Sequence, residues 1–306
     1  MTIAEPTRTG TAPFRGCETW YRITGDPDAR LTPLVVLHGG PGASHDYLLR
    51  LTALADRGRP VIHYDQIGTG NSTHRPDAPA DFWTVQLFLD ELDNLLDHLG
   101  IAGAYHVLGQ SWGGMLAAEH AVRRPAGLRS LIIADSPASM ELWLAEANRL
   151  RAMLPPDVQA TLLAHEAAGT TDDPAYHEAE QVYNERHLCR VVPMPPEVQA
   201  SFRVMEDDPT VYHTMNGPSE FHVIGSLKDW SIIDRLHRID VPTLLISGRH
   251  DEATEATVQP YAEHIPDARW SIFPDSSHMP HVEEEESYMN LVASFLFDHD
   301  APVAVR

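Results

Sequence analysis

The chain has 306 residues, of which 43% are hydrophobic, so it can bury a large core as one domain with an insertion or as two domains. Its 44 acidic and 22 basic side chains give a net charge of −22, which argues against binding to nucleic-acid phosphates. The two cysteines lack the spacing of a disulfide framework or a metal site. No apolar run suits a signal segment or a membrane span. We therefore expect a soluble, cytoplasmic protein.

Short apolar runs along the chain predict the strands of a mostly parallel sheet. Each run ends in polar turn residues, and continuous apolar runs of this length are typical of strands buried on both faces. The runs cover residues 34–37, 61–64, 105–108, 131–134, 244–246 and 270–273. Helical patterns alternate with several of them, which indicates an α/β fold. Ligands of such sheets bind at the carboxyl ends of the strands, where these polar turns lie.

Two helices are expected in the first half of the chain. Segment 82–99 is amphipathic, with leucines on one face and the acids Asp90, Glu91, Asp93 and Asp97 elsewhere. Segment 115–123 continues directly from a glycine-rich turn. Near the end of the chain, the acidic run 283–286 is expected to begin a solvated helix, because the helix dipole favours acids there.

The strand–helix alternation stops near Pro137 and resumes at Val241. The segment between them contains helical stretches at 140–153 and 174–188 and no run typical of a buried strand. It is too long and too patterned for a loop. We therefore expect an α/β core formed by residues 1–136 and 232–306, with a helical cap inserted over residues 137–231.

The sequence GQSWGG, residues 109–114, fits the pattern G-x-S-x-G between a strand and a helix. A serine at this turn exposes its hydroxyl at the edge of the sheet, and the flanking Gly109 and Gly113 leave room for the sharp turn. Ser111 is the predicted nucleophile. A structural serine in a glycine turn is the alternative.

A nucleophilic serine needs a base, and the base needs an orienting acid, in the chain order Ser, Asp or Glu, His. Asp251 follows a late predicted strand and His278 follows the next one, so both fall at the carboxyl edge in that order. His281 is the alternative base. His250 belongs to the same loop as the acid and is interpreted as a turn residue.

The sequence HGGPG, residues 38–42, follows the first strong buried strand. Its glycines allow a backbone N–H to approach a reacting carbonyl, so the N–H groups of Gly40 and Trp112 are predicted to form an oxyanion hole. His38 is expected to brace this loop without transferring protons. A tight structural turn is the alternative, and a phosphate loop is disfavoured because the lysine and the Ser/Thr of that motif are missing.

Five motifs together resemble the proline iminopeptidase family of α/β-hydrolases: HGGPG, YDQIGTGNS, GQSWGG, GRHDE and SSHMPH. The resemblance runs from about Thr19 to Phe297, and RHLCR and MNGPSEFHVIGSLKDW resemble segments of the family's cap. The nearest branch contains broad aminopeptidases and L-amino acid amidases. The resemblance implies removal of an N-terminal amino acid by a serine nucleophile, with no metal or other cofactor. Ile67 and Asn71 depart from the family's usual pattern in the second motif.

The resemblance also implies that two glutamates hold the substrate's α-ammonium group. They match Glu220, in GPSEF, and Glu252, which directly follows the predicted triad acid. Two close carboxylates repel each other, so we expect a raised pKa for at least one of them. Tyr212 either lines the substrate pocket or packs in the core. A surface acid in a loop is the alternative for Glu252, and a backbone-bonded cap residue is the alternative for Glu220.

The predicted function is hydrolysis of the amide bond after an N-terminal amino acid. The predicted partner is a small molecule or peptide with a free N-terminal amine, without nucleic acid or membrane. Three alternatives stay open: removal of an aminoacyl group from a non-peptide secondary metabolite, a carboxylesterase without amine recognition, and a binding protein on a hydrolase scaffold. The preferred N-terminal residue, the leaving group and the oligomeric state do not follow from the sequence.

Overall fold

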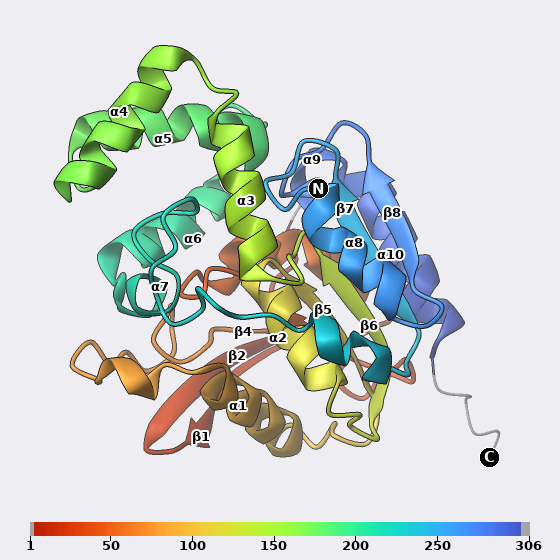
Figure 1. The fold of residues 1–306 in the computed structure, drawn as a ribbon. Coiled ribbons are helices and arrows are strands. Elements are labelled where there is room, and N and C mark those ends of the chain that lie inside the picture. The colour runs from red at the N-terminus through yellow and green to blue at the C-terminus, as the bar shows by residue number, and fades with distance from the viewer. Residues whose placement is uncertain (1–2, 301–306) are drawn as a thin grey trace.

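The computed structural model describes residues 3–300 and contains one mixed sheet with helices packed on both faces (Figure 1). Residues 1, 2 and 301–306, which the predicted bounds of the core include, lie outside the described residues. The eight strands of the sheet follow the order β1-β2-β4-β3-β5-β6-β7-β8.

The predicted apolar runs form the parallel part of this sheet. These strands pair in parallel from β4 through β3 and on to β8, and nearly all of their residues are buried except along β8 at the edge. The bounds are β3 (Leu34–Leu37), β4 (Val61–Tyr64), β5 (Tyr105–Gln110), β6 (Leu128–Ala134), β7 (Thr243–Gly248) and β8 (Arg269–Phe273). The prediction of a mostly parallel α/β sheet is confirmed.

Two strands at the other edge were not predicted. The strands β1 (Arg8–Phe14) and β2 (Cys17–Thr24) form an antiparallel hairpin, and β2 pairs antiparallel with β4. Several residues of β1 are exposed, so this strand lacks a continuous apolar run.

The two helices expected at 82–99 and 115–123 begin and end close to their predicted bounds. Helix α1 (Val85–His98) starts where the Thr84 hydroxyl accepts a hydrogen bond of 3.1 Å from Leu87 N, which satisfies one free donor of the first turn. One expectation is wrong: Glu91 is as buried as the leucines of α1, because the loop after β4 covers it. The other core helices are η1 (His45–Arg57), η2 (Ala80–Phe82), α2 (Trp112–Ala121), η3 (Ile233–Arg238), α8 (Glu255–His264), α9 (Pro280–Glu283) and α10 (Glu285–Asp298).

A run of helices separates β6 from β7. The predicted helices at 140–153 and 174–188 are confirmed as α3 (Met140–Arg151) and α5 (Pro174–His187), whereas α4 (Pro156–Ala168), α6 (Pro196–Asp207) and α7 (Thr210–Met215) were not predicted. The two ends of this segment are joined by hydrogen bonds from Met140 N to Trp230 O and from Ile232 N to Ala138 O. In Figure 1 these helices form a group of their own beside the sheet. Within residues 3–300, no helix has both the length and the apolarity needed to cross a membrane.

Candidate active site

Ser111 occupies a sharp turn between β5 and α2, as predicted. Its backbone has φ 57° and ψ −126°, a conformation that residues other than glycine rarely adopt. The flanking glycines are required by space: a Cβ atom at Gly113 would lie 2.1 Å from Leu37 O, and one at Gly109 would lie 2.0 Å from Gly113 O. The strained turn holds the hydroxyl of Ser111 at the edge of a pocket.

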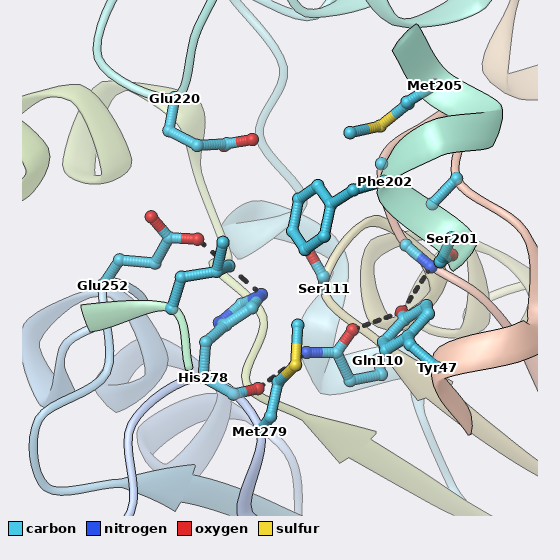
Figure 2. Close-up of a pocket in the computed structure, with 14 residues that line it drawn as sticks. Tyr47, Gln110, Ser111, Ser201, Phe202, Met205, Glu220, Glu252, His278 and Met279 are labelled. Atoms are coloured by element: carbon cyan, nitrogen blue, oxygen red, sulfur yellow. Dashed lines mark hydrogen bonds and ion pairs between the residues drawn. The ribbon is translucent and has the colours of Figure 1, made fainter. Parts of the chain in front are cut away.

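The structure brings the predicted acid and base together. His278 Nδ1 lies 2.7 Å from Asp251 Oδ1, and both side chains are buried. Asp251 Oδ1 also accepts a hydrogen bond of 2.8 Å from Ala253 N, which fixes the carboxylate in the turn after β7. Among the described residues that line the pocket, His278 is the one histidine, and it shares the pocket with Ser111 (Figure 2).

The alternative base, His281, lies outside this pocket. Its Nε2–H donates to Tyr47 O at 3.0 Å, and burial lowers the pKa of His281 to about 3. The ring is therefore a neutral part of the core. His250 is exposed at the surface, and its carbonyl oxygen accepts a hydrogen bond from His187 Nδ1.

Gly40 and Trp112 both line a recess beside Ser111. Gly40 has φ +107°, and a Cβ atom there would lie 2.5 Å from Gly42 N, so the loop requires glycine at this position. Trp112 is the first residue of α2, and the backbone N–H at that position has no acceptor within its helix. The two predicted oxyanion donors thus flank the same serine.

His38 braces the loop of the predicted oxyanion hole, as expected. Its Nε2 accepts a hydrogen bond of 3.0 Å from Gln66 N, and its carbonyl oxygen accepts one of 2.9 Å from Gln66 Nε2. Burial lowers the pKa of His38 to about 4, so the ring is neutral and can accept. Gln66 Oε1 also accepts from the indole N–H of Trp112 at 2.8 Å, which ties the loops of both predicted oxyanion donors to one residue.

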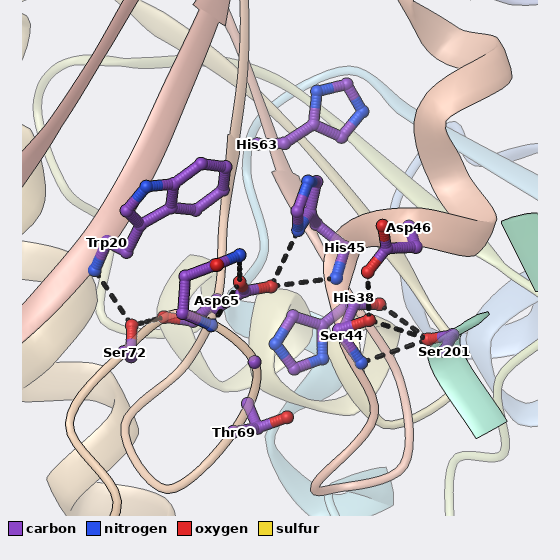
Figure 3. A network of polar contacts seen from close by, with 12 residues as sticks. Trp20, His38, Ser44, His45, Asp46, His63, Asp65, Thr69, Ser72 and Ser201 are labelled. Carbon is purple, nitrogen blue, oxygen red and sulfur yellow. Dashed lines mark hydrogen bonds and ion pairs between the residues drawn. The ribbon is translucent and has the colours of Figure 1, made fainter. Parts of the chain in front are cut away.

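A second brace surrounds Asp65 (Figure 3). This buried carboxylate accepts hydrogen bonds from His45 N, His45 Nδ1, Asn71 N and Asn71 Nδ2, all at 2.8–2.9 Å. Burial acts to raise the pKa of Asp65, but these bonds and the nearby His45 outweigh it and hold the pKa below its usual range. Next to it, Ser44 N donates to Ser201 Oγ, and Ser201 Oγ donates to Ser44 O. These two bonds fasten the loop before η1 to α6.

The pocket around Ser111 is a hollow of about 440 Å³ that opens to solvent. Core loops form one part of its wall, and the segment between β6 and β7 forms the rest. From that segment come Leu188, Ser201, Phe202, Met205 and Glu220 (Figure 2). The core contributes Gly39, Gly40, Ala43, Tyr47, Gln110, Ser111, Glu252, His278 and Met279.

Glu220 and Glu252 face this same pocket (Figure 2). Glu252 Oε1 lies 3.9 Å from His278 Nε2. Burial raises the pKa of Glu252 well above its usual range, and the charges of Glu220 and Asp251 add to the rise. Burial also raises the pKa of Glu220, against an opposing hydrogen bond of 2.5 Å that the Tyr212 hydroxyl donates. The expected pKa rise is confirmed, and Tyr212 proves to be a hydrogen-bond partner of Glu220.

A series of hydrogen bonds behind the pocket was not predicted from the sequence. Gly39 N donates to Tyr47 Oη at 2.7 Å, Tyr47 Oη donates to Gln110 Oε1, and Gln110 Nε2 donates to His278 O at 2.9 Å. These three hydrogen bonds therefore link the loop of the predicted oxyanion hole to the loop of the predicted base.

The acidic run 283–286 matches expectation only in part: Glu285 and Glu286 lie in the first turn of α10, but the two acids before them act differently. Glu283 accepts hydrogen bonds from Ser277 N and Ser277 Oγ, and Glu284 Oε2 accepts from Ser276 Oγ at 2.6 Å. These acids hold the loop that carries His278, because the loop folds back onto the start of the helices that follow it. They do not simply begin a solvated helix.

Comparison with known proteins places this chain in a family. Residues 32–285 match the family model of the alpha/beta hydrolase fold. A proline iminopeptidase of Lactobacillus delbrueckii subsp. lactis is 39% identical over 290 residues, which cover 94% of this chain and 97% of the relative. The chain belongs to the proline iminopeptidase family of α/β-hydrolases. A second proline iminopeptidase, from Lactiplantibacillus plantarum, is 36% identical to this chain. The match covers 94% of this chain and all of the relative.

Solved structures agree with the family assignment. The crystal structure of VinJ is 57% identical, has a TM-score of 0.95, and matches 96% of this chain and all of its own. The crystal structure of the proline iminopeptidase of Mycobacterium smegmatis is 55% identical with a TM-score of 0.88, covering 95% of this chain and 98% of its own. The predicted α/β-hydrolase fold and the predicted family are confirmed.

Proposed function

We propose that this member of the proline iminopeptidase family hydrolyses the amide bond after an N-terminal amino acid that has a free α-amine. Family membership makes the chain a hydrolase of the aminopeptidase type. The observation that carries the finer proposal is the pair of buried carboxylates, Glu220 and Glu252, on the pocket of Ser111 and His278. The substrate class is a peptide or small amide with a free N-terminal amine.

The amine would bind between the two glutamates. Without substrate, burial and mutual repulsion favour protonated carboxyl groups there. An ammonium group supplies the positive charge that lets both groups ionise, and one such pair at about 4 Å contributes up to roughly 4 kcal/mol at an effective dielectric near 20, before desolvation costs. An acyl group without the amine gains nothing from this site.

The chemical step uses the proposed triad. His278 removes the hydroxyl proton of Ser111 as the Oγ atom attacks the substrate carbonyl carbon. The N–H groups of Gly40 and Trp112 stabilise the oxyanion, each contributing roughly 2.7–4 kcal/mol. Asp251 keeps the His278 ring oriented through the Nδ1 contact of 2.7 Å. The imidazolium then protonates the leaving amine, the C–N bond breaks, and an acyl-enzyme remains.

Deacylation repeats these steps with water. His278 takes a proton from a water molecule as its oxygen attacks the acyl carbon, and the ester bond to Ser111 breaks as His278 returns the proton to Oγ. The free amino acid leaves.

The helical segment 137–231 acts, in this proposal, as a cap that limits the size of the N-terminal portion. Support comes from its contribution to the pocket wall, where Phe202 and Met205 of α6 stand across from the proposed amine site (Figure 2). The hydrogen bonds that join residues 138–140 to 230–232 close this segment at its base and support the predicted bounds.

Glu252→Gln tests the amine-binding proposal. We expect kcat/KM for an aminoacyl arylamide to fall by about ten- to a hundredfold, because a charge-assisted hydrogen bond to the ammonium group is lost. A simple acyl ester without the amine should react at nearly the wild-type rate. The measurement is the steady-state kinetics of both substrates.

Glu206→Gln is the matched control, because Glu206 lies in α6 with the same charge but is exposed and outside the pocket. It should leave both substrates unchanged. Equal losses on amide and ester in Glu252→Gln would reject amine binding and indicate a disturbed triad. Wild-type turnover of the ester alone would favour a carboxylesterase.

A further inference from the structure

A second buried aspartate lies behind the proposed triad acid. Asp135 directly follows β6, and its backbone has φ +50°, in the left-handed region. Its backbone N–H donates to Ile246 O at 2.8 Å, and its Oδ1 accepts from Gly248 N at 3.2 Å. The residue is fully buried, so the ends of β6 and β7 hold its carboxyl group in one place.

Asp135 and Asp251 are close neighbours, because both bond to Gly248: its N–H donates to Asp135 Oδ1, and its carbonyl oxygen accepts from Asp251 N. In each carboxyl group, Oδ1 accepts the hydrogen bonds. Asp135 Oδ1 accepts from Gly248 N, and Asp251 Oδ1 accepts from Ala253 N and from the His278 ring. Both Oδ2 atoms are buried, and no N–H or side-chain O–H of another described residue donates to them. The two side chains lie within hydrogen-bonding reach of each other, and two carboxyl groups can form a hydrogen bond only when they share a proton.

The surroundings favour the neutral form of Asp135. Burial raises the pKa of Asp135 well above its usual range, and the charges of Asp251 and Glu283 add to the rise. The other titratable groups facing it are Tyr47 of η1 and Tyr288 of α10, whose own pKa values burial raises. Neither tyrosine supplies a positive charge that would ionise Asp135.

We propose that Asp135 is a positioning residue that keeps its carboxyl proton and donates it to Asp251 Oδ2. This inference rests on the proposed function, in which Asp251 orients His278. With Oδ1 bound to His278 and Ala253 and Oδ2 bound to Asp135, the Asp251 carboxylate cannot rotate. The pair carries one negative charge instead of two, which avoids the cost of a second unpaired buried charge.

Asp135→Asn and Asp135→Ala separate this role from simple packing. Asparagine tolerates the left-handed backbone, can accept from Gly248 N and can donate an N–H to Asp251. We expect Asp135→Asn to keep kcat/KM for an aminoacyl arylamide within about threefold, with an unchanged acid limb of the pH profile. Asp135→Ala removes the donor, so kcat/KM should fall about tenfold or more. The acid limb should move to higher pH, because a more strongly charged Asp251 holds the imidazolium more tightly.

Infrared difference spectra of wild type against Asp135→Asn give a readout independent of activity. At neutral pH the wild type should contain one carboxylic acid C=O band that the variant lacks. Thermal unfolding checks that Asp135→Ala is folded; if it is not, the asparagine variant and its spectrum decide alone.

Absence of that band, or an asparagine variant as impaired as the alanine one, would overturn the proposal. A folded alanine variant with wild-type rates would do the same. If the wild type fails to cleave aminoacyl arylamides at all, the proposed function fails instead, and the infrared comparison still tests the proton on Asp135.

Discussion

Glu91 illustrates how a single acid can be buried in a helix at the expense of its charge. Its Oε1 accepts hydrogen bonds of 2.6 Å from Thr19 Oγ1 and 2.9 Å from Ile67 N, while no described residue donates to its Oε2. Burial raises the pKa of Glu91 to about 8, and the bonds from Thr19 and Ile67 only partly oppose this. Glu91 is therefore a neutral prop beneath the loop that holds Asp65.

We expect Glu91→Gln to remove a pH dependence of stability. The unfolded chain releases this proton near pH 4.5 and the native protein near pH 8, so the native state is favoured fully below pH 4.5 and loses that advantage as pH rises to about 8. The wild-type free energy of unfolding, relative to the variant, should fall by up to about 1.4 kcal/mol per pH unit across this window.

Urea unfolding at pH 5.5 and pH 8 measures this difference. Asp97→Asn is the control, because Asp97 lies in the same helix with an exposed side chain and should show no such trend. A difference between wild type and Glu91→Gln that stays constant with pH would show that Glu91 is charged in the native protein.

Residues that act at strand ends were predictable, and residues that act through remote partners were not. Ser111, Asp251 and His278 each follow an apolar run, and parallel strands gather their carboxyl ends at one edge. Gln110 is different: its partners Tyr47 and His278 lie 63 and 168 residues away, and no local pattern marks such a contact. Asp135 also stands at the end of a strand, but its relation to Asp251 depends on a partner far along the chain, which no local pattern marks.

At the scale of elements, the turn from β5 into α2 sets the position of the serine. The start of α2 packs so closely on the end of β3 that a Cβ atom at Gly113 would lie 2.1 Å from Leu37 O and 2.8 Å from His38 O. Both neighbours are backbone atoms of the segment that leads into the loop of the predicted oxyanion hole. Close packing at this one point therefore aligns the predicted nucleophile with the predicted oxyanion donors.

Gly113→Ala should separate these elements. We expect a loss of about 1–3 kcal/mol or more in stability, or a melting temperature lower by roughly 2–10 °C, because backbone must shift to admit the methyl group. The value of kcat/KM should fall even where the variant stays folded, since Ser111 moves with the turn. Thermal unfolding and arylamide kinetics measure both effects.

Gly103→Ala is the matched control, because a Cβ atom there meets no atom within 4 Å. It should change neither stability nor rate. Equal behaviour of the two variants would contradict the proposed role of close packing at the turn.

The elements differed in how well their sequences revealed them. The parallel strand β3 was clear because every residue is apolar and buried, and β6 was clear because its residues 131–134 are. The edge strand β1 contains Gly10 and Pro13 and is half exposed, so no pattern marks it. Helix α4 has Leu162 as its one buried residue, which leaves no apolar face to detect.

At the scale of the whole molecule, the site lies between two parts of the chain that are far apart in sequence. The sheet's carboxyl edge carries Ser111, His278 and Glu252, while α6 and the residues after α7 bring Phe202 and Glu220 over them. The α/β architecture and the run of helices between β6 and β7 could be predicted from the alternation of apolar runs. How its helices pack over the site did not, because that depends on tertiary contacts such as those between Ser44 and Ser201.

The net charge of −22 contributes little to this specificity, because surface charges are screened within about a Debye length. In the proposed function, selection for a free amine depends instead on the two carboxyl groups of Glu220 and Glu252, which are buried, so screening by salt is weak. The central claim is therefore that this hydrolase requires an ammonium group beside the scissile carbonyl.

The most direct test compares one aminoacyl arylamide with its N-acetylated form on the wild-type protein. Ser111→Ala serves as the control, and it should lose both turnover and covalent labelling by a serine-directed phosphonate. We predict that the free-amine substrate is cleaved and that acetylation lowers kcat/KM by about a hundredfold or more. Equal cleavage of the two forms would contradict the account.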